Sequence, residues 1–198
     1  TPWRPLISKL GYSVGFMIVI LGRQQLFTEN TLTPVIHVLR ERQLTVLWNA
    51  LRLWVVVLGA NILGTLIFGV GLYFTDVFDP PQTAALGSVA GHAVAGSFAD
   101  TFVSALFAGW LIALMVWLLP AAETARVGVI IIITYLVGLG GFSHIIAGSA
   151  QVFYALAANA TSLTAALSNF FLPTLLGNVV GGVALVAALN YAQVSQDE

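Results

Sequence analysis

The stretch "GFSHIIAGSA", residues 141–150, places a histidine, His144, inside one of the most apolar parts of the chain. The run "VGVIIIITYLVGLG" (127–140) precedes it, and no acidic or basic residue follows until Asp197. The glycines around the histidine favour backbone that departs from a helix. Such backbone cannot face hydrocarbon, so it survives in a membrane only against protein or along a wet cavity. The stretch therefore predicts a membrane-spanning helix that is broken near its middle.

Composition places the whole chain in the membrane class. Charged residues make up 8% of its 198 residues and hydrophobic residues 59%, with a mean hydropathy of +0.95. About a quarter of the residues are charged in a typical soluble domain. We therefore predict an all-α polytopic membrane protein, with a single transmembrane domain over 1–198 in the lipid bilayer. The net charge of −1, without a basic cluster, argues against a nucleic-acid partner. With no cysteine and three scattered histidines, neither a metal site nor another cofactor is expected.

Five apolar stretches are long enough to act as membrane spans. Their ranges are 12–39, 53–74, 101–119, 127–157 and 166–189. The first is interrupted by "GRQQLFTENTLTP" (22–34), and the fourth by the histidine stretch quoted above. Paired interruptions of this kind are typical of discontinuous helices at a transport site. Two broken helices are therefore expected among the five spans.

Loop charges predict an orientation. Lys and Arg follow the first and third spans, whereas the connection 75–100 has none. Because basic residues favour the cytoplasmic side, the two basic loops are expected inside and that connection outside. The C-terminal segment, 190–198, is then expected to be cytoplasmic, in a multi-pass protein of the inner membrane.

An internal echo relates the two broken spans. "NILGT" begins at Asn61 in the second span, and "NVVGG" begins at Asn178 in the last, 117 residues later. The same offset carries Phe27 onto His144. Under the predicted orientation the two Asn helices are antiparallel, as in inverted repeats. We therefore predict an inverted repeat of six helices, of which five are visible and the first is absent.

His144 is the leading candidate for a functional side chain. An ionisable group in a membrane helix is costly, and it is functional more often than in a soluble core. One interpretation is a pore-lining group that offers a hydrogen bond or a proton to a passing solute. The alternative is a neutral histidine that bonds to a carbonyl of the next helix.

The other break supplies a second set of candidates. Thr28 can present a hydroxyl to a pore, while Leu26 and Phe27 can form an apolar constriction. Alternatively, Thr28 caps the half-helix that follows it. Arg23 and Glu29 are expected to pair with each other across the loop.

Two further groups of residues have possible roles outside the pore, one in helix packing and one in catalysis. Asn61 with Gly64, and Asn178 with Gly181, are expected to pack helices closely with an interhelical hydrogen bond. Ser149 lies near the histidine, which faintly resembles an intramembrane serine protease. A Ser–His pair needs hydrogen-bonding reach and an oxyanion hole, so a hydrolase is the weaker alternative.

These segments, taken in order, resemble the formate/nitrite transporter family, in particular its divergent bacterial branch. The resemblance covers nearly all of the chain. It rests on "LFT" (26–28), "LWVVVLGANILGTLIF" (53–68), "GWLIALMVW" (109–117), "GFSHIIAG" (141–148) and "PTLLGNVVGG" (173–182). It implies a homopentamer of aquaporin-like six-helix protomers, each with its own pore. It also implies passage of small monovalent anions such as formate, nitrite or hydrosulfide, often with a proton.

The resemblance also implies site residues. His144 matches the central pore histidine, and Thr28 matches the hydroxyl of the loop that faces it. Leu26 and Phe27 match the positions beside that hydroxyl. The remaining implied pore positions are Tyr12 and Val137 at the outer constriction and Phe16 and Ile112 on the apolar inner side.

Three positions depart from the family's pattern. Ser143 stands where the family has an acidic residue, and Gly148 where it has an asparagine. The family's vestibule lysine would fall near Ala93, but no lysine follows Lys9, and His92 is the nearest substitute. Because anion capture at a pore mouth depends on few charges, slower anion permeation or a preference for the neutral conjugate acid is expected.

The function expected from the sequence is therefore transport rather than catalysis. The chain is predicted to form a channel or transporter for small monovalent anions or their conjugate acids, with or without proton coupling. A pore for neutral small solutes is the alternative, favoured by the missing vestibule lysine.

Overall fold

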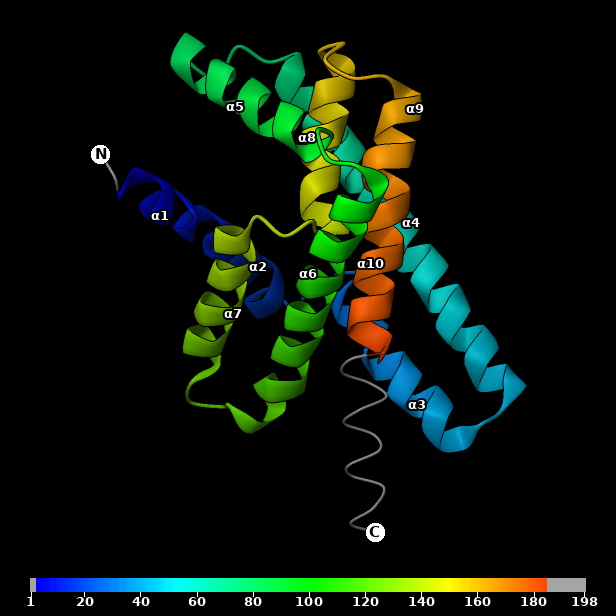
Figure 1. The fold of residues 1–198 in the computed structure, drawn as a ribbon. Helices are drawn as coiled ribbons and strands as arrows, with labels where there is room; N and C mark the ends of the chain where they lie inside the picture. Colours follow the sequence, from blue (N-terminus) through cyan, green and yellow to red (C-terminus); the bar gives the residue numbers. More distant parts are fainter. Residues whose placement is uncertain (1–2, 185–198) are drawn as a thin grey trace.

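The computed structural model describes residues 3–184, and these fold into helices joined by loops (Figure 1). Residues 185–189 of the last predicted span, and the C-terminal segment 190–198, lie outside the described residues. The elements in chain order are α1 (Arg4–Ser8), α2 (Leu10–Leu21), η1 (Glu29–Thr31), α3 (Thr33–Glu41), α4 (Leu44–Tyr73), α5 (Pro80–Ala93), α6 (Phe98–Leu118), η2 (Leu119–Ala121), α7 (Arg126–Gly140), α8 (Ile145–Ala157), α9 (Leu163–Ala166), η3 (Leu167–Phe171) and α10 (Leu172–Gly182).

Several of these helices are long and apolar enough to cross a membrane. Within the described range they are α4, α6 together with η2, and the continuous run from α9 through the π-helical η3 to α10. The pair α7 and α8 qualifies as a further span, bent by 44° at its break. The all-helical, multi-pass membrane fold predicted from the sequence is thereby confirmed. At its start, α4 extends beyond the predicted window 53–74, because the helix continues through polar residues such as Arg52.

The two breaks are built differently. The α7 helix ends at Gly141, whose φ of 62° lies in the left-handed region that glycine adopts without a steric penalty. Only three further residues separate that turn from α8. The other break is longer. It begins after α2 with Arg23, which also has a positive φ, and continues through η1 to α3, where Pro34 occupies the first turn.

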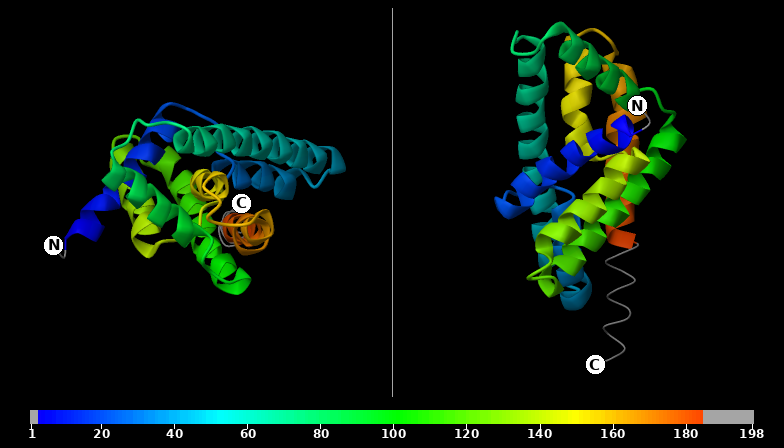
Figure 2. Two further views of the ribbon diagram at one scale, coloured as in Figure 1. Left: turned by 90° about the horizontal axis from the view of Figure 1, so that it is seen from above. Right: turned by 90° about the vertical axis from the view of Figure 1, so that its left-hand side faces the viewer.

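The helices that follow the breaks point in opposite directions. In Figure 1, α8 rises from the middle of the molecule to the end covered by α5, whereas α3 descends to the other end. The α6 and α10 helices pack side by side, α7 packs on α2, and α4 packs on α8. The end-on view in Figure 2 shows the long α4 helix at one side of this bundle.

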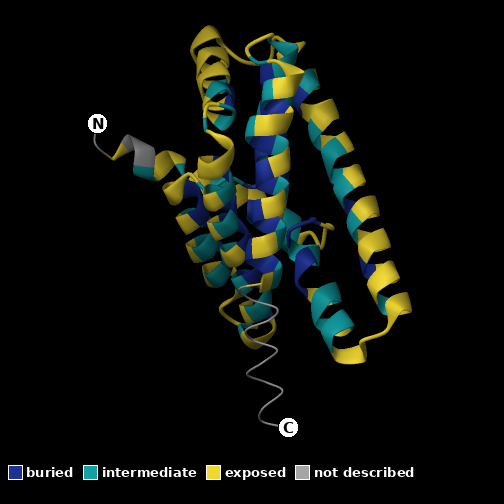
Figure 3. Ribbon diagram, turned by 45° about the vertical axis from the view of Figure 1, so that its right-hand side comes forward, coloured by how far each residue is buried: buried dark blue, intermediate teal, exposed yellow. Residues whose placement is uncertain are grey.

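Burial separates the inner helices from the outer one. Figure 3 shows buried residues along α6 and α10, while α4 is exposed over most of its length. The main apolar core brings together buried side chains from the first break and from α2, α4, α6, α7 and α8, and Phe142 of the second break packs against it. The breaks therefore lie where helices surround them and not on the exposed face. This is the location that unpaired backbone in a membrane requires.

Candidate functional site

Two cavities lie beside the second break and share part of their walls. The larger has a volume of about 670 Å³ and the smaller about 280 Å³. Their walls share three residues: Tyr12, His144 and Ala147. We call these three residues the neck. Tyr12 lies at the start of the first predicted broken span, whereas His144 and Ala147 lie near the middle of the second.

His144 caps the first turn of α8. Its Nδ1 accepts a hydrogen bond from the backbone N–H of Ala147 at 3.2 Å, and its Nε2 lies 2.7 Å from Thr28 Oγ1. Because Nδ1 acts as an acceptor, the proton of the neutral ring resides on Nε2, which donates to Thr28. Phe16 meets the ring edge-on, with centroids 5.2 Å apart. The imidazole, 2% exposed, therefore bonds to a hydroxyl of the opposite break and not to a carbonyl of the next helix.

Two asparagines hold the two breaks in place. Asn178 Oδ1 accepts from the N–H of Ile145 at 2.8 Å, and its Nδ2 donates to the carbonyl of Ser143 at 2.9 Å. Asn61 repeats this arrangement, accepting from Phe27 at 2.9 Å and donating to the carbonyl of Gln25 at 3.0 Å. Each asparagine thus bonds to residues two apart in its loop.

Asn178 makes one further bond, from Nδ2 to the carbonyl of Ala105 on α6 at 2.8 Å. An interhelical hydrogen bond was expected of both asparagines, and this bond is one. The sequence did not indicate, however, that the main partner of each amide is the broken loop. Backbone groups that left the helix regain partners in this way.

The matched hydrogen bonds correct the register of the repeat. Phe27 and Ile145 occupy equivalent positions, and so do Gln25 and Ser143. Leu26, not Phe27, is therefore the counterpart of His144. The expected offset of 117 residues holds for the asparagines but becomes 118 in the loops, because Phe27 lies 34 residues before Asn61 and Ile145 lies 33 residues before Asn178.

The predicted pore residues divide into two groups. Tyr12, Phe16, Leu26, Val137 and His144 line one or both cavities. The other three predicted residues, Thr28, Phe27 and Ile112, are buried and line neither cavity.

Each residue of the second group has a different environment. Thr28 reaches the neck through its hydrogen bond to His144. Phe27 packs edge-on against Trp54 of α4, with centroids 6.1 Å apart. Ile112 lies in the apolar core, fully buried on α6. Phe27, which was expected at an apolar constriction, and Ile112, which the resemblance placed on the apolar inner side, both occupy packed core positions in this structure.

The two predicted packing glycines differ. A side chain at Gly181 would collide with the carbonyl of Leu106, so α10 and α6 approach as closely as predicted. Gly64 faces open space, with nothing within 4 Å of the position a Cβ would take. The packing role expected for Gly64 is therefore wrong within the described chain. The close glycine of α4 is Gly69, which lies against the backbone of α8 at Ala150.

One other expectation needs correction, and one alternative can be compared with the structure. No ion pair joins Arg23 and Glu29 among residues 3–184, and the buried Oε1 of Glu29 has no hydrogen-bond partner there. Arg23 is exposed, because its left-handed backbone turns the chain outward at the end of α2. Ser149 donates to the carbonyl of Ile145 in its own helix. Since both nitrogens of His144 have other partners, the Ser–His pair of a hydrolase is not formed.

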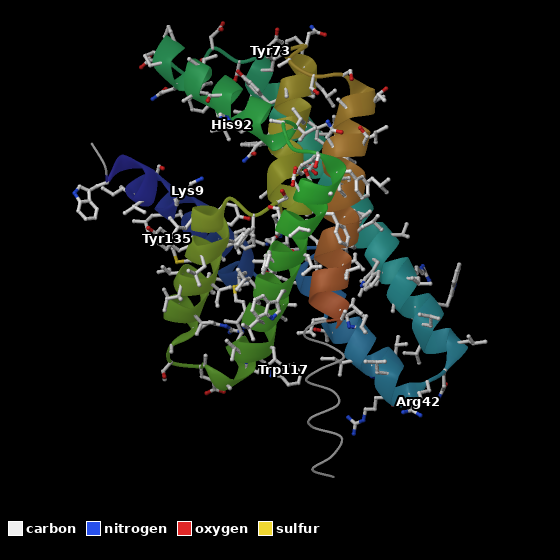
Figure 4. All side chains as sticks on the ribbon, viewed as in Figure 1. Lys9, Arg42, Tyr73, His92, Trp117 and Tyr135 are labelled. Carbon is white, nitrogen blue, oxygen red and sulfur yellow. The ribbon has the colours of Figure 1, made fainter. Side chains whose placement is uncertain are left out.

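The larger cavity carries the charged residues of the site. Lys9, His92 and Asp100 line its wall together with Ser143 and Ser104. Figure 4 shows Lys9, at the junction of α1 and α2, and His92, near the end of α5, on the same side of the molecule. His92 Nδ1 donates to the carbonyl of Ser88 at 2.6 Å. A cation therefore does reach this cavity wall, supplied by Lys9 and not by a residue near Ala93.

Ser143, like the two asparagines, has a hydrogen-bond partner that the sequence did not reveal. Its backbone N–H donates to Ser104 Oγ at 3.0 Å, and the two hydroxyl oxygens lie 3.3 Å apart. No local pattern marks Ser104 as the partner of a loop 39 residues away. The pair places neutral hydroxyls at the position where the resemblance implies a carboxylate.

Solved structures share this architecture. A structure described as a pentameric formate channel with formate bound superposes with a TM-score of 0.79 at 23% identity, over 96% of this chain and 83% of that one. A second, described as an FNT family ion channel, gives 0.79 at 21% identity, over 98% and 78%. The protein thus belongs to the class of multi-pass membrane proteins with the broken-helix fold of these channels.

Sequence comparison identifies the family. The model described as Formate/nitrite transporter matches residues 2–192, so the chain belongs to the formate/nitrite transporter family, as the sequence analysis predicted. The chain is 38% identical over 192 residues to inner membrane protein YfdC of Escherichia coli (strain K12), covering 97% of this chain and 62% of that protein. It is 33% identical to formate-nitrite transporter 3 of Toxoplasma gondii (strain ATCC 50611 / Me49), covering 91% and 37%. The chain therefore spans less than two thirds of the length of either relative.

Proposed function

We propose that the protein is a channel or transporter for small monovalent anions of the formate and nitrite type, or for their conjugate acids. One observation carries the proposal. Two cavities share the three neck residues, and His144 of the neck bonds to Thr28 of the other break. A passage through that neck would run between two half-helices, which is where broken-helix transporters bind their substrates.

The larger cavity has the charges needed to collect an anion. Lys9 and His92 line it, with Asp100 as the acidic residue of the same wall. A cleft with low-dielectric walls focuses the field of a few charges and raises the local concentration of oppositely charged solutes. We therefore assign anion capture to Lys9.

The smaller cavity favours a neutral species. Apart from the neck, its wall consists of apolar or small residues, namely Gly11, Gly15, Phe16, Val19, Leu26 and Ile146. An unpaired charge loses far more free energy than a neutral molecule in such surroundings. The solute is therefore proposed to cross this part as its conjugate acid.

The hydrogen bonds of His144 limit its part in that protonation. A second proton would have to join Nδ1, where it would displace the N–H of Ala147. The proton is therefore proposed to reach the solute in the larger cavity and not from His144. Because Nε2–H donates to Thr28 Oγ1, this bond fixes the orientation of the imidazole ring at the neck.

The assembly and location follow from the relatives. The matched channel is described as pentameric, and YfdC is described as an inner membrane protein. We propose a homopentamer in the inner membrane with a cytoplasmic C-terminus, as the basic loops indicate. Transport rather than catalysis is proposed, because Ser149 and His144 have other hydrogen-bond partners.

The test is flux in liposomes that contain the full-length protein, with formate and nitrite supplied at several external pH values. Transport of the conjugate acid predicts that flux at fixed total formate rises as the pH falls, because the acid fraction rises. His144→Asn is expected to lower flux at least about fivefold, the effect of one lost hydrogen bond. His37→Asn is the matched control, since His37 is exposed on α3 and lines neither cavity.

A pore for neutral solutes is the second candidate, favoured by the apolar wall of the smaller cavity. It predicts that liposomes swell in small neutral solutes such as glycerol faster than formate enters. The proposal of acid or anion transport is contradicted if neither formate nor nitrite flux exceeds that of protein-free liposomes.

A further inference from the structure

Tyr12 has a polar group that its surroundings leave without a partner. Its hydroxyl oxygen is out of contact with solvent and has no hydrogen-bond partner among the described residues. A buried donor without a partner costs free energy, because it loses its bond to water and gains none. Such a group in a native structure calls for a physical reason.

The position of Tyr12 distinguishes it from other buried polar groups of this kind. Glu29 Oε1 and Thr174 Oγ1 are also unpartnered within residues 3–184, but neither residue lines one of the two cavities. Tyr12 lines both. Its hydroxyl therefore belongs to the residue that forms one side of the neck.

The other two residues of the neck have their polar groups engaged. His144 uses Nδ1 and Nε2, and the N–H of Ala147 donates to Nδ1. Within the part of the chain that the structure describes, the Tyr12 hydroxyl is thus the one polar side-chain group of the neck that still lacks a partner.

Packing holds the tyrosine ring in place. Its centroid lies 5.0 Å from that of Phe16, and a Cβ at Gly138 of α7 would lie 3.2 Å from Tyr12 Cβ. The ring is therefore confined between α2 and α7, and its hydroxyl cannot reach solvent without moving these contacts. A solute in the neck, which Tyr12 lines, would supply the missing acceptor.

We propose that the Tyr12 hydroxyl donates a hydrogen bond to an acceptor oxygen of the solute in the neck. The inference rests on the proposed function and narrows its substrate class to small oxyanions and their acids, such as carboxylates and nitrite. The smaller solute hydrosulfide, which has no oxygen, gains less from the tyrosine.

The substitution Tyr12→Phe tests this inference, because it removes the hydroxyl and keeps the ring. Initial formate and nitrite flux, measured below saturation with the full-length protein in liposomes, is expected to fall about fivefold. Hydrosulfide flux is expected to fall less than about twofold. The midpoint of thermal unfolding is expected to stay or rise, since no intramolecular hydrogen bond is lost.

Tyr135→Phe is the matched control. The Tyr135 hydroxyl donates to the carbonyl of Leu6 at 3.2 Å and lines neither cavity, so flux should match that of the wild type. Unchanged or increased formate flux in Tyr12→Phe overturns the inference, and so does an equal loss for hydrosulfide. A wild-type protein that carries none of these solutes removes the proposed function, and the inference with it.

Discussion

The two broken segments share a backbone arrangement and differ in chemistry. In each, the asparagine of a later helix, Asn61 of α4 or Asn178 of α10, accepts a hydrogen bond from a backbone N–H of the break. The same side chain donates to the carbonyl two residues before that N–H. The equivalent positions of the repeat carry unlike side chains. Leu26 is equivalent to His144, and Thr28 is equivalent to Ile146. Each half thus contributes one polar and one apolar residue, at exchanged positions. The polar pair meets in the Thr28–His144 hydrogen bond.

The comparison of the two breaks distinguishes residues that hold the loop backbone from residues that form the site. The asparagines repeat because both loops need the same backbone partners. The side chains that join the two halves do not repeat, because Thr28 of one half bonds to His144 of the other. The residues that repeat between the halves therefore hold the backbone of the two breaks, and the residues that differ form the candidate site.

Replacing the asparagines should lower the free energy of unfolding by unequal amounts in the two halves. This is the largest expected effect. Asn178→Ala removes three hydrogen bonds and leaves buried backbone groups unpaired, so the free energy of unfolding should fall by about 4 kcal/mol. Asn61→Ala removes two bonds at a half-buried position and should cost about 2 kcal/mol. Unfolding in mixed micelles by titration with sodium dodecyl sulfate measures both.

The control for this pair is Asn169→Ala. The Asn169 side chain accepts only from the neighbouring Ser168 hydroxyl at the surface, and its loss should cost less than about 0.5 kcal/mol. Equal losses for Asn61 and Asn178 would mean that the bond to α6 adds nothing, and that the halves are held equally.

The glycines three residues after each asparagine give the next largest difference. Gly181→Ala places a methyl group on the carbonyl of Leu106, a backbone atom that cannot move cheaply, so a loss of about 3 kcal/mol is expected. Gly64→Ala meets open space within one protomer and should leave stability unchanged or raise it by up to about 1 kcal/mol through helix propensity. The same detergent unfolding experiment compares the two.

Gly64 also tests the proposed assembly. If Gly64→Ala keeps the protomer folded but abolishes the pentamer in native mass spectrometry, the open face of α4 is a subunit contact. A destabilised protomer would instead contradict the open environment of this glycine in the structure.

The fold was predictable from the sequence because its signals are local. Apolar runs of span length, and glycine-rich or polar breaks within two of them, indicate a broken-helix membrane protein without any knowledge of contacts. His144 and Thr28 were also predictable as a facing pair, through the family resemblance. These signals depend on composition within a short window, and the membrane environment makes such composition decisive.

The details of the site were less predictable because they depend on distant residues. Lys9 and His92 line one cavity although they are 83 residues apart, and no pattern links them. Gly64 and Gly181 look alike in sequence, since small residues suit both a packed and an open face. The repeat register was off by one because an offset taken from the asparagines carries no information on loop length.

The Thr28–His144 bond gives the smallest expected effect and the sharpest test of how the halves differ. His144→Leu makes the second break resemble the first, and Thr28→Val removes the partner hydroxyl at nearly constant shape. Because the two residues bond directly, their effects on the free energy of unfolding should couple by about 1 kcal/mol. A double-mutant cycle in mixed micelles measures this coupling.

A parallel cycle with Thr65→Val calibrates that measurement. The Thr65 hydroxyl donates to the carbonyl of Ile62 in its own helix, so its removal should add to His144→Leu without coupling. Additive effects for Thr28 as well would contradict a direct bond between the halves, because each side chain would then act alone. A coupling confined to Thr28 instead ties the stability of the breaks to the pair that faces the neck. The violation of symmetry at positions 26 and 144 would then be a requirement of the site, since a leucine at both positions leaves the Thr28 hydroxyl without its partner.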